Sequence, residues 1–162
     1  MRRAALGVAV ALGVAVALGA PAAATTTRRS VPAAVRAATP ARRPFRGLTQ
    51  TVVHIGGQPL TVVVAQTETQ REQGLRRRAT IGPYDGMLFV FTQDTQVGFT
   101  MSTVPVRLQI GFYDRAGRVV DRLLMRPCPH AESQCPVYES TGPFRYAVET
   151  LAGGLPAGRL TG

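Results

Sequence analysis

The stretch Gly86-Met-Leu-Phe-Val-Phe91 decides how this chain is expected to fold. It places five apolar residues in a row and lies between Pro83-Tyr-Asp85 and Thr92-Gln-Asp94, which favour turns. A short apolar run that is bounded by turn residues is typical of a buried strand. We therefore expect this strand to lie in the core.

Two β-branched segments before it predict a hairpin. They are Thr51-Val-Val-His-Ile55 and Leu60-Thr-Val-Val-Val-Ala65, and Gly56-Gly-Gln-Pro59 joins them. A Gly-Gly pair permits the positive φ angles that tight hairpin turns need. The segment Thr67-Glu-Thr-Gln70 then resembles a capping box, which predicts a short helix over residues 67–75.

Further strands are expected after the apolar run. Residues 97–101 form one candidate, and residues 108–113 alternate large apolar residues with others, as a half-buried strand does. Asp114-Arg-Ala-Gly117 suits a type I turn that returns residues 118–125 antiparallel, and residues 144–150 form the last strand. Seven strands and one short helix predict an α+β domain over residues 48–162. It is expected to be mainly antiparallel β and barrel-like or sandwich-like.

Residues 1–24 have the three parts of a cleavable signal peptide. Arg2 and Arg3 give a positive start, residues 4–20 form an uncharged apolar run, and Ala22-Ala-Ala24 offers small residues to a signal peptidase. The run is shorter than the ~20 strongly apolar residues of a membrane-spanning helix, which favours cleavage over anchoring. We therefore expect a secreted or periplasmic protein.

Residues 25–47 are expected to form a disordered, basic linker. They are rich in Pro, Ala, Thr and Arg and hold a single aromatic residue, too little apolar surface to offset the entropy of ordering. Residues 1–47 carry eight Arg and no acid, which gives +8 of the formal net charge of +10. The remaining part is nearly neutral, so we expect no nucleic-acid partner. The linker is either a spacer or a weak electrostatic contact to an anionic wall polymer or lipid.

The motifs along the domain follow a characteristic order. They are Ala65-Gln-Thr67, Arg71, Gly74-Leu75, Arg78, Gly86-Met-Leu-Phe-Val-Phe91, Phe99-Thr-Met101, Gly117-Arg-Val-Val120 and Cys135-Pro-Val-Tyr138. In this order and spacing the chain resembles the domain of unknown function 192 family, small domains of bacteria and archaea, over residues 53–160. The resemblance implies a compact, mainly antiparallel β fold with little helix, and it implies no known activity.

The chain departs from the family pattern after Met101. Ser102, Thr103 and Val104 stand where the family has a basic residue, Asn and Thr, and Gln109 stands where it has Asp. The apolar positions around them are kept. If the polar residues of the family form a site, this chain keeps the scaffold and alters the site.

Cys128 and Cys135, the only two cysteines, are expected to form a disulfide because export places them in an oxidising compartment. Two alternatives compete with this interpretation. A redox couple usually has two residues between its cysteines, whereas six separate these two. A metal site would have to recruit His130 and the distant His54. We expect no metal and no cofactor.

The sequence contains no motif of a nucleophilic or metal-dependent enzyme, and its nine acidic residues are scattered, so we predict no catalytic residue. Arg78, which the family keeps basic, is expected to form a buried ion pair or to contact an anion. Its possible partners are Asp85 and Glu149. Together with Gln109 and Tyr138, which could line a cleft beside the disulfide, these residues are the candidate ligand contacts.

These observations favour a secreted, monomeric, non-enzymatic module that binds an envelope component or another exported protein. The alternative is an extracellular hydrolase or another enzyme. An enzyme would show a pocket where four of the candidate side chains converge, whereas a binding module would show an open face or an exposed sheet edge. The four side chains are those of Arg78, Asp85, Gln109 and Tyr138.

Overall fold

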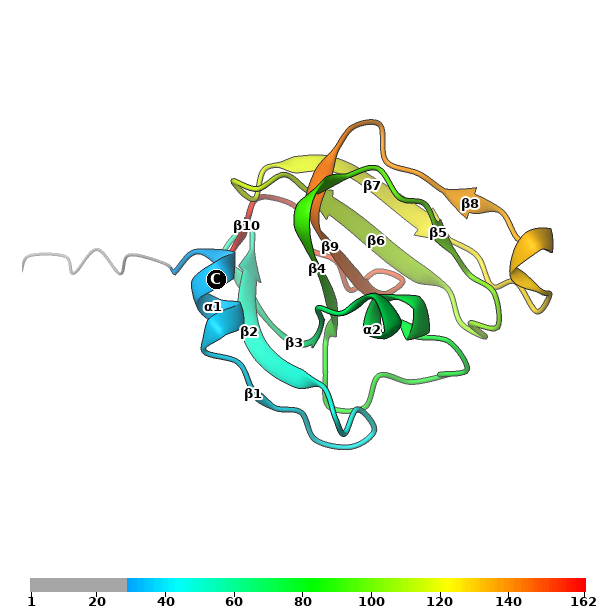
Figure 1. Cartoon of the computed structure of the whole chain (residues 1–162), viewed down its shortest axis with the longest axis horizontal. Helices are drawn as coiled ribbons and strands as arrows, with labels where there is room; N and C mark the ends of the chain where they lie inside the picture. The colour runs from blue at the N-terminus through cyan, green and yellow to red at the C-terminus, as the bar shows by residue number, and fades with distance from the viewer. Residues whose placement is uncertain (1–28) are drawn as a thin grey trace, which may run out of the picture.

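The structure is a computed structural model that describes residues 29–162 (Figure 1). The expected signal peptide over residues 1–24 lies outside the described residues. Within residues 29–162 the chain forms ten strands, two short α-helices and one 3-10 helix, so the fold is α+β and rich in strands. The main sheet is open and does not close into a barrel.

The helices and strands are the following, in chain order. They are α1 (Val31–Arg36), β1 (Thr39–Pro40), β2 (Thr49–Ile55), β3 (Gln58–Ala65), α2 (Glu68–Gln73), β4 (Gly86–Thr95), β5 (Phe99–Thr100), β6 (Leu108–Tyr113), β7 (Val119–Met125), η1 (Glu132–Gln134), β8 (Val137–Tyr138), β9 (Phe144–Leu151) and β10 (Leu160–Thr161).

The main sheet has the strand order β1-β2-β3-β4-β9-β6-β7, and β10 also pairs with β2. Its pairs are antiparallel except β3 and β4, which run parallel. Parallel neighbours need a crossover connection, and residues 66–85, which include α2, provide it (Figure 1). Strands β5 and β8 form a separate two-stranded sheet. The crossover therefore places α2 beside β4.

Local sequence signals predict the hairpins and the helix cap correctly. Gly56 and Gly57, both with positive φ, turn β2 into β3. The Gly117 amide donates to the Asp114 carbonyl at 2.9 Å, which closes the turn between β6 and β7. Thr67 and Gln70 form the expected capping box at the start of α2.

Apolar side chains are buried on both faces of the sheet. Core A contains Met87, Phe89 and Phe112, and core B contains Leu88 and Val148. Successive residues of a strand point to opposite faces, so a strand between two cores is apolar at consecutive positions. The double burial explains the apolar run of β4.

The disordered-linker prediction is wrong for residues 29–47. Helix α1 buries Val31 in core B and also buries Ala34, and the following loop buries Phe45 in core A. The Arg42 amide also donates to the Tyr84 hydroxyl at 2.6 Å. The few apolar residues that this segment buries in the folded domain suffice to order it, which composition alone does not reveal; they are Val31, Ala34, Ala41 and Phe45. We call residues 29–47 the N-terminal arm.

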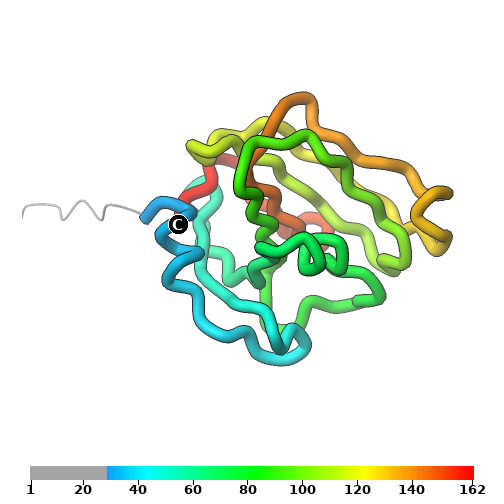
Figure 2. Tube along the Cα trace, viewed as in Figure 1, coloured from blue at the N-terminus to red at the C-terminus, as the bar shows by residue number. Residues whose placement is uncertain are grey.

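The N-terminal arm lies beside the C-terminal end of the chain (Figure 2). The Gly162 amide donates to the Arg29 carbonyl at 2.7 Å, and β10 pairs with β2 next to α1. The described domain therefore begins before residue 48. None of its helices is long and apolar enough to cross a membrane.

Candidate functional site

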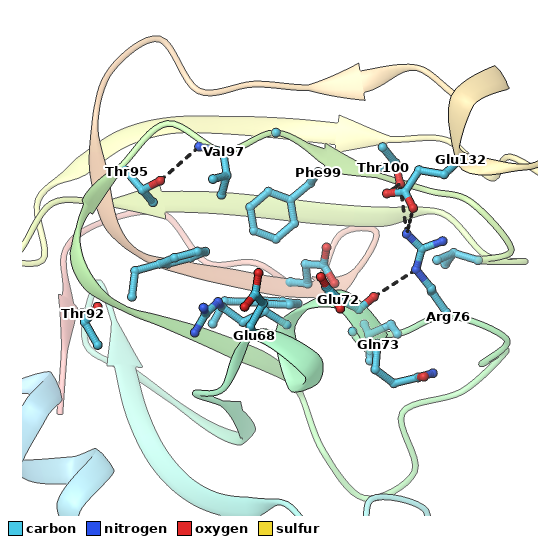
Figure 3. Close-up of a pocket in the computed structure, with 18 of the residues that line it drawn as sticks. Glu68, Glu72, Gln73, Arg76, Thr92, Thr95, Val97, Phe99, Thr100 and Glu132 are labelled. Carbon is cyan, nitrogen blue, oxygen red and sulfur yellow. Dashed lines mark hydrogen bonds and ion pairs between the residues drawn. The ribbon is translucent and has the colours of Figure 1, made fainter.

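A cleft of about 420 Å³ opens between α2 and the segment that links β4 to β5 (Figure 3). The capping box starts α2 directly after β3, and Gly74 ends it with a positive φ of 45°. A Cβ at Gly74 would lie 3.6 Å from the Phe89 ring, so the end of the helix rests on core A. The cleft thus lies on the core A face of the sheet.

The floor of the cleft is apolar. Leu75 and Val104 are buried, and both line it. The rings of Phe89 and Phe99 also line it and meet edge to face, with centroids 5.2 Å apart. These side chains offer an apolar body of a ligand a surface to cover.

Arg71 lies on the wall of the cleft and is held there by several partners. Its Nη1 donates to the carbonyl of Val90 at 3.2 Å and to that of Gln66. Its guanidinium carbon lies 4.8 Å from the centroid of the Phe91 ring, a cation–π arrangement. These contacts fix the Arg71 side chain in the wall of the cleft.

Arg76 closes one end of the cleft (Figure 3). Its Nη2 forms an ion pair of 2.8 Å with Oε2 of Glu132 in η1. Its Nε and Nη1 donate to the carbonyls of Glu72 and Ser102 at 3.0 and 3.2 Å. Arg76 therefore ties the end of α2 to the loop that carries η1, although an exposed ion pair contributes at most about 1 kcal/mol.

Glu149 in β9 is the one buried acid that lines the cleft within the described residues. It is 4% exposed, and its neighbours across the sheet are Met87 and Ile110, which carry no hydrogen-bond donor in their side chains. No described residue forms a hydrogen bond or an ion pair with its carboxyl group. Burial raises the pKa of Glu149 from 4.5 to about 8, so the carboxyl group is mostly protonated at neutral pH.

The five ligand contacts expected from the sequence do not come together. Glu149 lines the cleft, and the other four do not. Arg78 does not form the expected ion pair with Asp85 or Glu149, because its guanidinium lies over the Phe45 ring, 4.2 Å from the centroid.

Two of the other candidates have structural partners. Asp85 accepts a hydrogen bond from the Thr61 amide at 2.7 Å and so fastens the start of β4 to β3. The Tyr138 hydroxyl accepts from the Arg126 amide at 3.0 Å. Gln109 lies between Leu108 and Ile110, which face core A, so it points to the opposite face of the sheet.

Cys128 and Cys135 form the expected disulfide, with their Cα atoms 5.9 Å apart. Ser102 and Thr103 hold this loop, because the Ser102 hydroxyl donates to the His130 carbonyl and the Thr103 amide donates to the Cys128 carbonyl, both at 2.9 Å. Two of the positions that depart from the family pattern thus support the disulfide loop. A third such position, Val104, lines the cleft.

Several cleft residues were not named from the sequence, among them Glu68, Glu72 and Glu132. Glu68 and Glu72 are four residues apart, which places them on one face of α2, and Arg76 follows four residues later, just beyond the end of the helix. That spacing is the signal in the sequence from which these residues could have been found.

Within residues 29–162, no three side chains of the kinds that bind metals lie close enough together to hold an ion.

Comparison with known proteins finds a family and solved structures that resemble the chain. The sequence profile of DUF192, described as an uncharacterised ACR, matches residues 51–160. A solved structure of a protein of unknown function from Novosphingobium aromaticivorans is 24% identical, has a TM-score of 0.63, and covers 80% of this chain and 96% of its own. A candidate transcription regulator from Sinorhizobium meliloti is 29% identical, has a TM-score of 0.57, and covers 68% and 90%. No curated protein matches the chain in sequence.

Proposed function

Because the chain belongs to the DUF192 family, which is described as uncharacterised, we propose its function from its own cleft: it is an exported binding module that takes up a small ligand beside α2. The observation that carries the proposal is the buried carboxyl group of Glu149, which lines the cleft without a partner in the described chain. Buried polar groups normally have hydrogen-bond partners, and a missing partner costs about 1–3 kcal/mol. Neither carboxyl oxygen of Glu149 is fully enclosed, so a ligand in the cleft can reach them and recover part of that cost.

The shape and composition of the cleft support the same proposal. Ligand sites are concave, mostly apolar, and hold a few polar groups that orient the ligand, commonly in about 300–1,000 Å³. The cleft has an apolar floor, charged walls and a volume of about 420 Å³. It therefore suits a small organic molecule or one side chain of a peptide.

Export rests on the signal-peptide pattern of residues 1–24 and on the disulfide. The N-terminal arm leaves Arg36, Arg42, Arg43 and Arg46 exposed, and none of them has an ion-pair partner in the described part of the chain. These side chains support a weak contact with an anionic wall polymer or lipid. The module would then act at the cell envelope.

Two other functions receive less support. The side chains that line the cleft include no His, Cys or Ser, so a hydrolase would have to act through carboxyl groups or through a Thr hydroxyl that has no His beside it in the cleft. The Sinorhizobium neighbour is named as a candidate regulator of transcription. A nucleic-acid site is strongly basic, whereas four acids and two Arg residues line the cleft.

A titration with small organic molecules tests the proposal. The ¹⁵N-labelled protein should show ligand-dependent amide shifts in α2 and in the segment from β4 to β5. Val97 is 47% exposed at the cleft, so Val97→Trp should obstruct the cleft and remove these shifts. Val52→Trp is the matched control, because Val52 is 46% exposed on β2 and lies outside the cleft. Shifts that survive Val97→Trp, or no shifts at these amides with any molecule, would contradict the proposal.

A further inference from the structure

The cleft carries more negative than positive charge. Four carboxyl groups and two guanidinium groups line it. The acids are Glu68, Glu72, Glu132 and Glu149, and the bases are Arg71 and Arg76. Of these four acids, only Glu132 has an ion-pair partner among the described residues. Such a cleft repels anions and attracts cations.

Both guanidinium groups of the cleft are already engaged. Arg71 bonds two carbonyl groups and covers the Phe91 ring, and Arg76 bonds two carbonyl groups and pairs with Glu132. Neither reaches Glu149. When Glu149 is ionised, a counter-ion would therefore have to come from outside the described chain.

The burial of Glu149 would strengthen its interaction with a bound cation. Glu149 is 4% exposed as a residue, and in such a buried position the local dielectric is low and an ion pair is stronger than in water. A hydrogen bond from a charged donor to a carboxylate is about twice as strong as one between neutral groups. A bound cation would supply both interactions.

The aromatic floor favours the same type of ligand. The rings of Phe89 and Phe99 line the cleft close to each other, and ring faces attract ammonium and guanidinium groups. Arg71 over Phe91 is an example of this contact on the wall of the same cleft. Apolar parts of a ligand would pack on the rings and on Leu75.

We propose that the cleft selects an organic cation, an ammonium or guanidinium group on an apolar body, and that Glu149 is its counter-ion. This inference rests on the proposed binding function and names its ligand class. Glu68 and Glu72 on α2 add to the attraction at the wall, and Arg71 and Arg76 stay with their present partners.

A pH dependence follows, because Glu149 has to lose its proton to pair with a cation. The charged groups that face it across the cleft are Glu68, Arg71, Glu72, Arg76 and Glu132. With a pKa of about 8 in the free protein, the affinity for a permanently charged ligand should rise about 50-fold from pH 6 to pH 8. Above pH 8 the rise should level off.

Three probes of nearly equal size separate charge from shape: benzylamine, benzyl alcohol and benzoate. Titrations followed by amide shifts at α2 and β5 should show, at pH 8, benzylamine binding at least tenfold more tightly than benzyl alcohol. Benzoate should bind most weakly. The affinity for benzylamine, which is cationic at pH 6 and at pH 8, should increase about 50-fold between them, whereas that for benzyl alcohol should stay constant.

Two variants assign the effect to Glu149. Glu149→Gln keeps the size of the side chain and should remove both the preference for the amine and its pH dependence. Glu139→Gln is the matched control, because Glu139 is an exposed acid outside the cleft, and it should keep both. The pH dependence of the wild-type protein provides the test without any variant.

The outcomes distinguish the two proposals. Equal affinity for the amine and the alcohol at pH 8, or a benzylamine affinity that does not change with pH, would overturn the inference of cation selection and leave the binding cleft in place. Failure of all three probes to shift amides at α2 and β5 would contradict the inference and the proposed function together.

Discussion

Replacing Glu149 by Gln should change how the stability of the fold depends on pH. Glu149 is 4% exposed as a residue, and the burial of its carboxyl group raises the pKa of that group from 4.5 to about 8. The folded state therefore holds this proton more tightly than the unfolded state does. The stabilisation is full below about pH 4.5 and is progressively lost as the pH rises to about 8. A glutamine side chain does not titrate, so the Glu149→Gln variant should lack this component.

The size of the effect follows from the two pKa values. One pKa unit corresponds to about 1.4 kcal/mol, so the rise from 4.5 to about 8 corresponds to about 5 kcal/mol over the whole range. About 2–3 kcal/mol of this loss falls between pH 6 and pH 9. That part lies within a pH range in which folded proteins are readily studied.

The assay is urea unfolding of the wild-type protein, Glu149→Gln and Glu139→Gln at pH 6 and pH 9. The wild-type protein and Glu139→Gln should lose about 2–3 kcal/mol more of their free energy of unfolding over this interval than Glu149→Gln does. Comparison with the Glu149→Gln variant removes the contribution of all other titrating groups. Equal losses in the wild-type protein and Glu149→Gln would refute the reasoning.

Three further substitutions test individual parts of the fold. Replacing both Cys128 and Cys135 by Ser opens an eight-residue loop and should lower the free energy of unfolding by about 2–3 kcal/mol; alkylation of the native protein followed by mass spectrometry should find both thiols blocked. Thr67→Ala removes the cap of α2 and should cost about 1 kcal/mol in urea unfolding, with Thr69→Ala as a control inside the same helix. Phe45→Ala should cost about 3 kcal/mol and expose the N-terminal arm to trypsin at its Arg residues. An arm that is digested equally fast in the wild-type protein would mean that Phe45 does not anchor it.

Elements that short-range chemistry determines could be predicted from the sequence. The hairpin turn at Gly56-Gly57, the turn closed by Gly117 and the capping box at Thr67 each depend on contacts within a few residues. The apolar run of β4 was interpreted correctly because burial on both faces leaves an unmistakable composition. The family resemblance, now supported by the match over residues 51–160, agreed with these signals.

The N-terminal arm could not be predicted in the same way. Val31 and Phe45 are buried only because core A and core B lie beneath them, and their neighbours in sequence are polar, small or charged. The two-residue strands β1, β8 and β10 likewise exist through their pairing partners. A short window of sequence does not show which distant core or strand such a segment will contact.

The candidate site could be predicted only in part from the sequence, for a related reason. Glu149 was named from the sequence as a partner for Arg78, and the structure gives it a different environment, in the wall of the cleft. Its burial depends on neighbours in β4 and β6 that lie far away in sequence. The spacing of Glu68, Glu72 and Arg76 can be read from the sequence. It does not predict a cleft, because the cleft forms only when α2 packs beside core A.

The most direct test of the account is a ¹³C NMR titration of the Glu149 carboxyl carbon, with and without benzylamine. The account predicts a midpoint near pH 8 in the free protein and a clearly lower midpoint when benzylamine is bound, because a bound cation stabilises the carboxylate. A midpoint near 4.5 in the free protein, or one that benzylamine leaves unchanged, would contradict it.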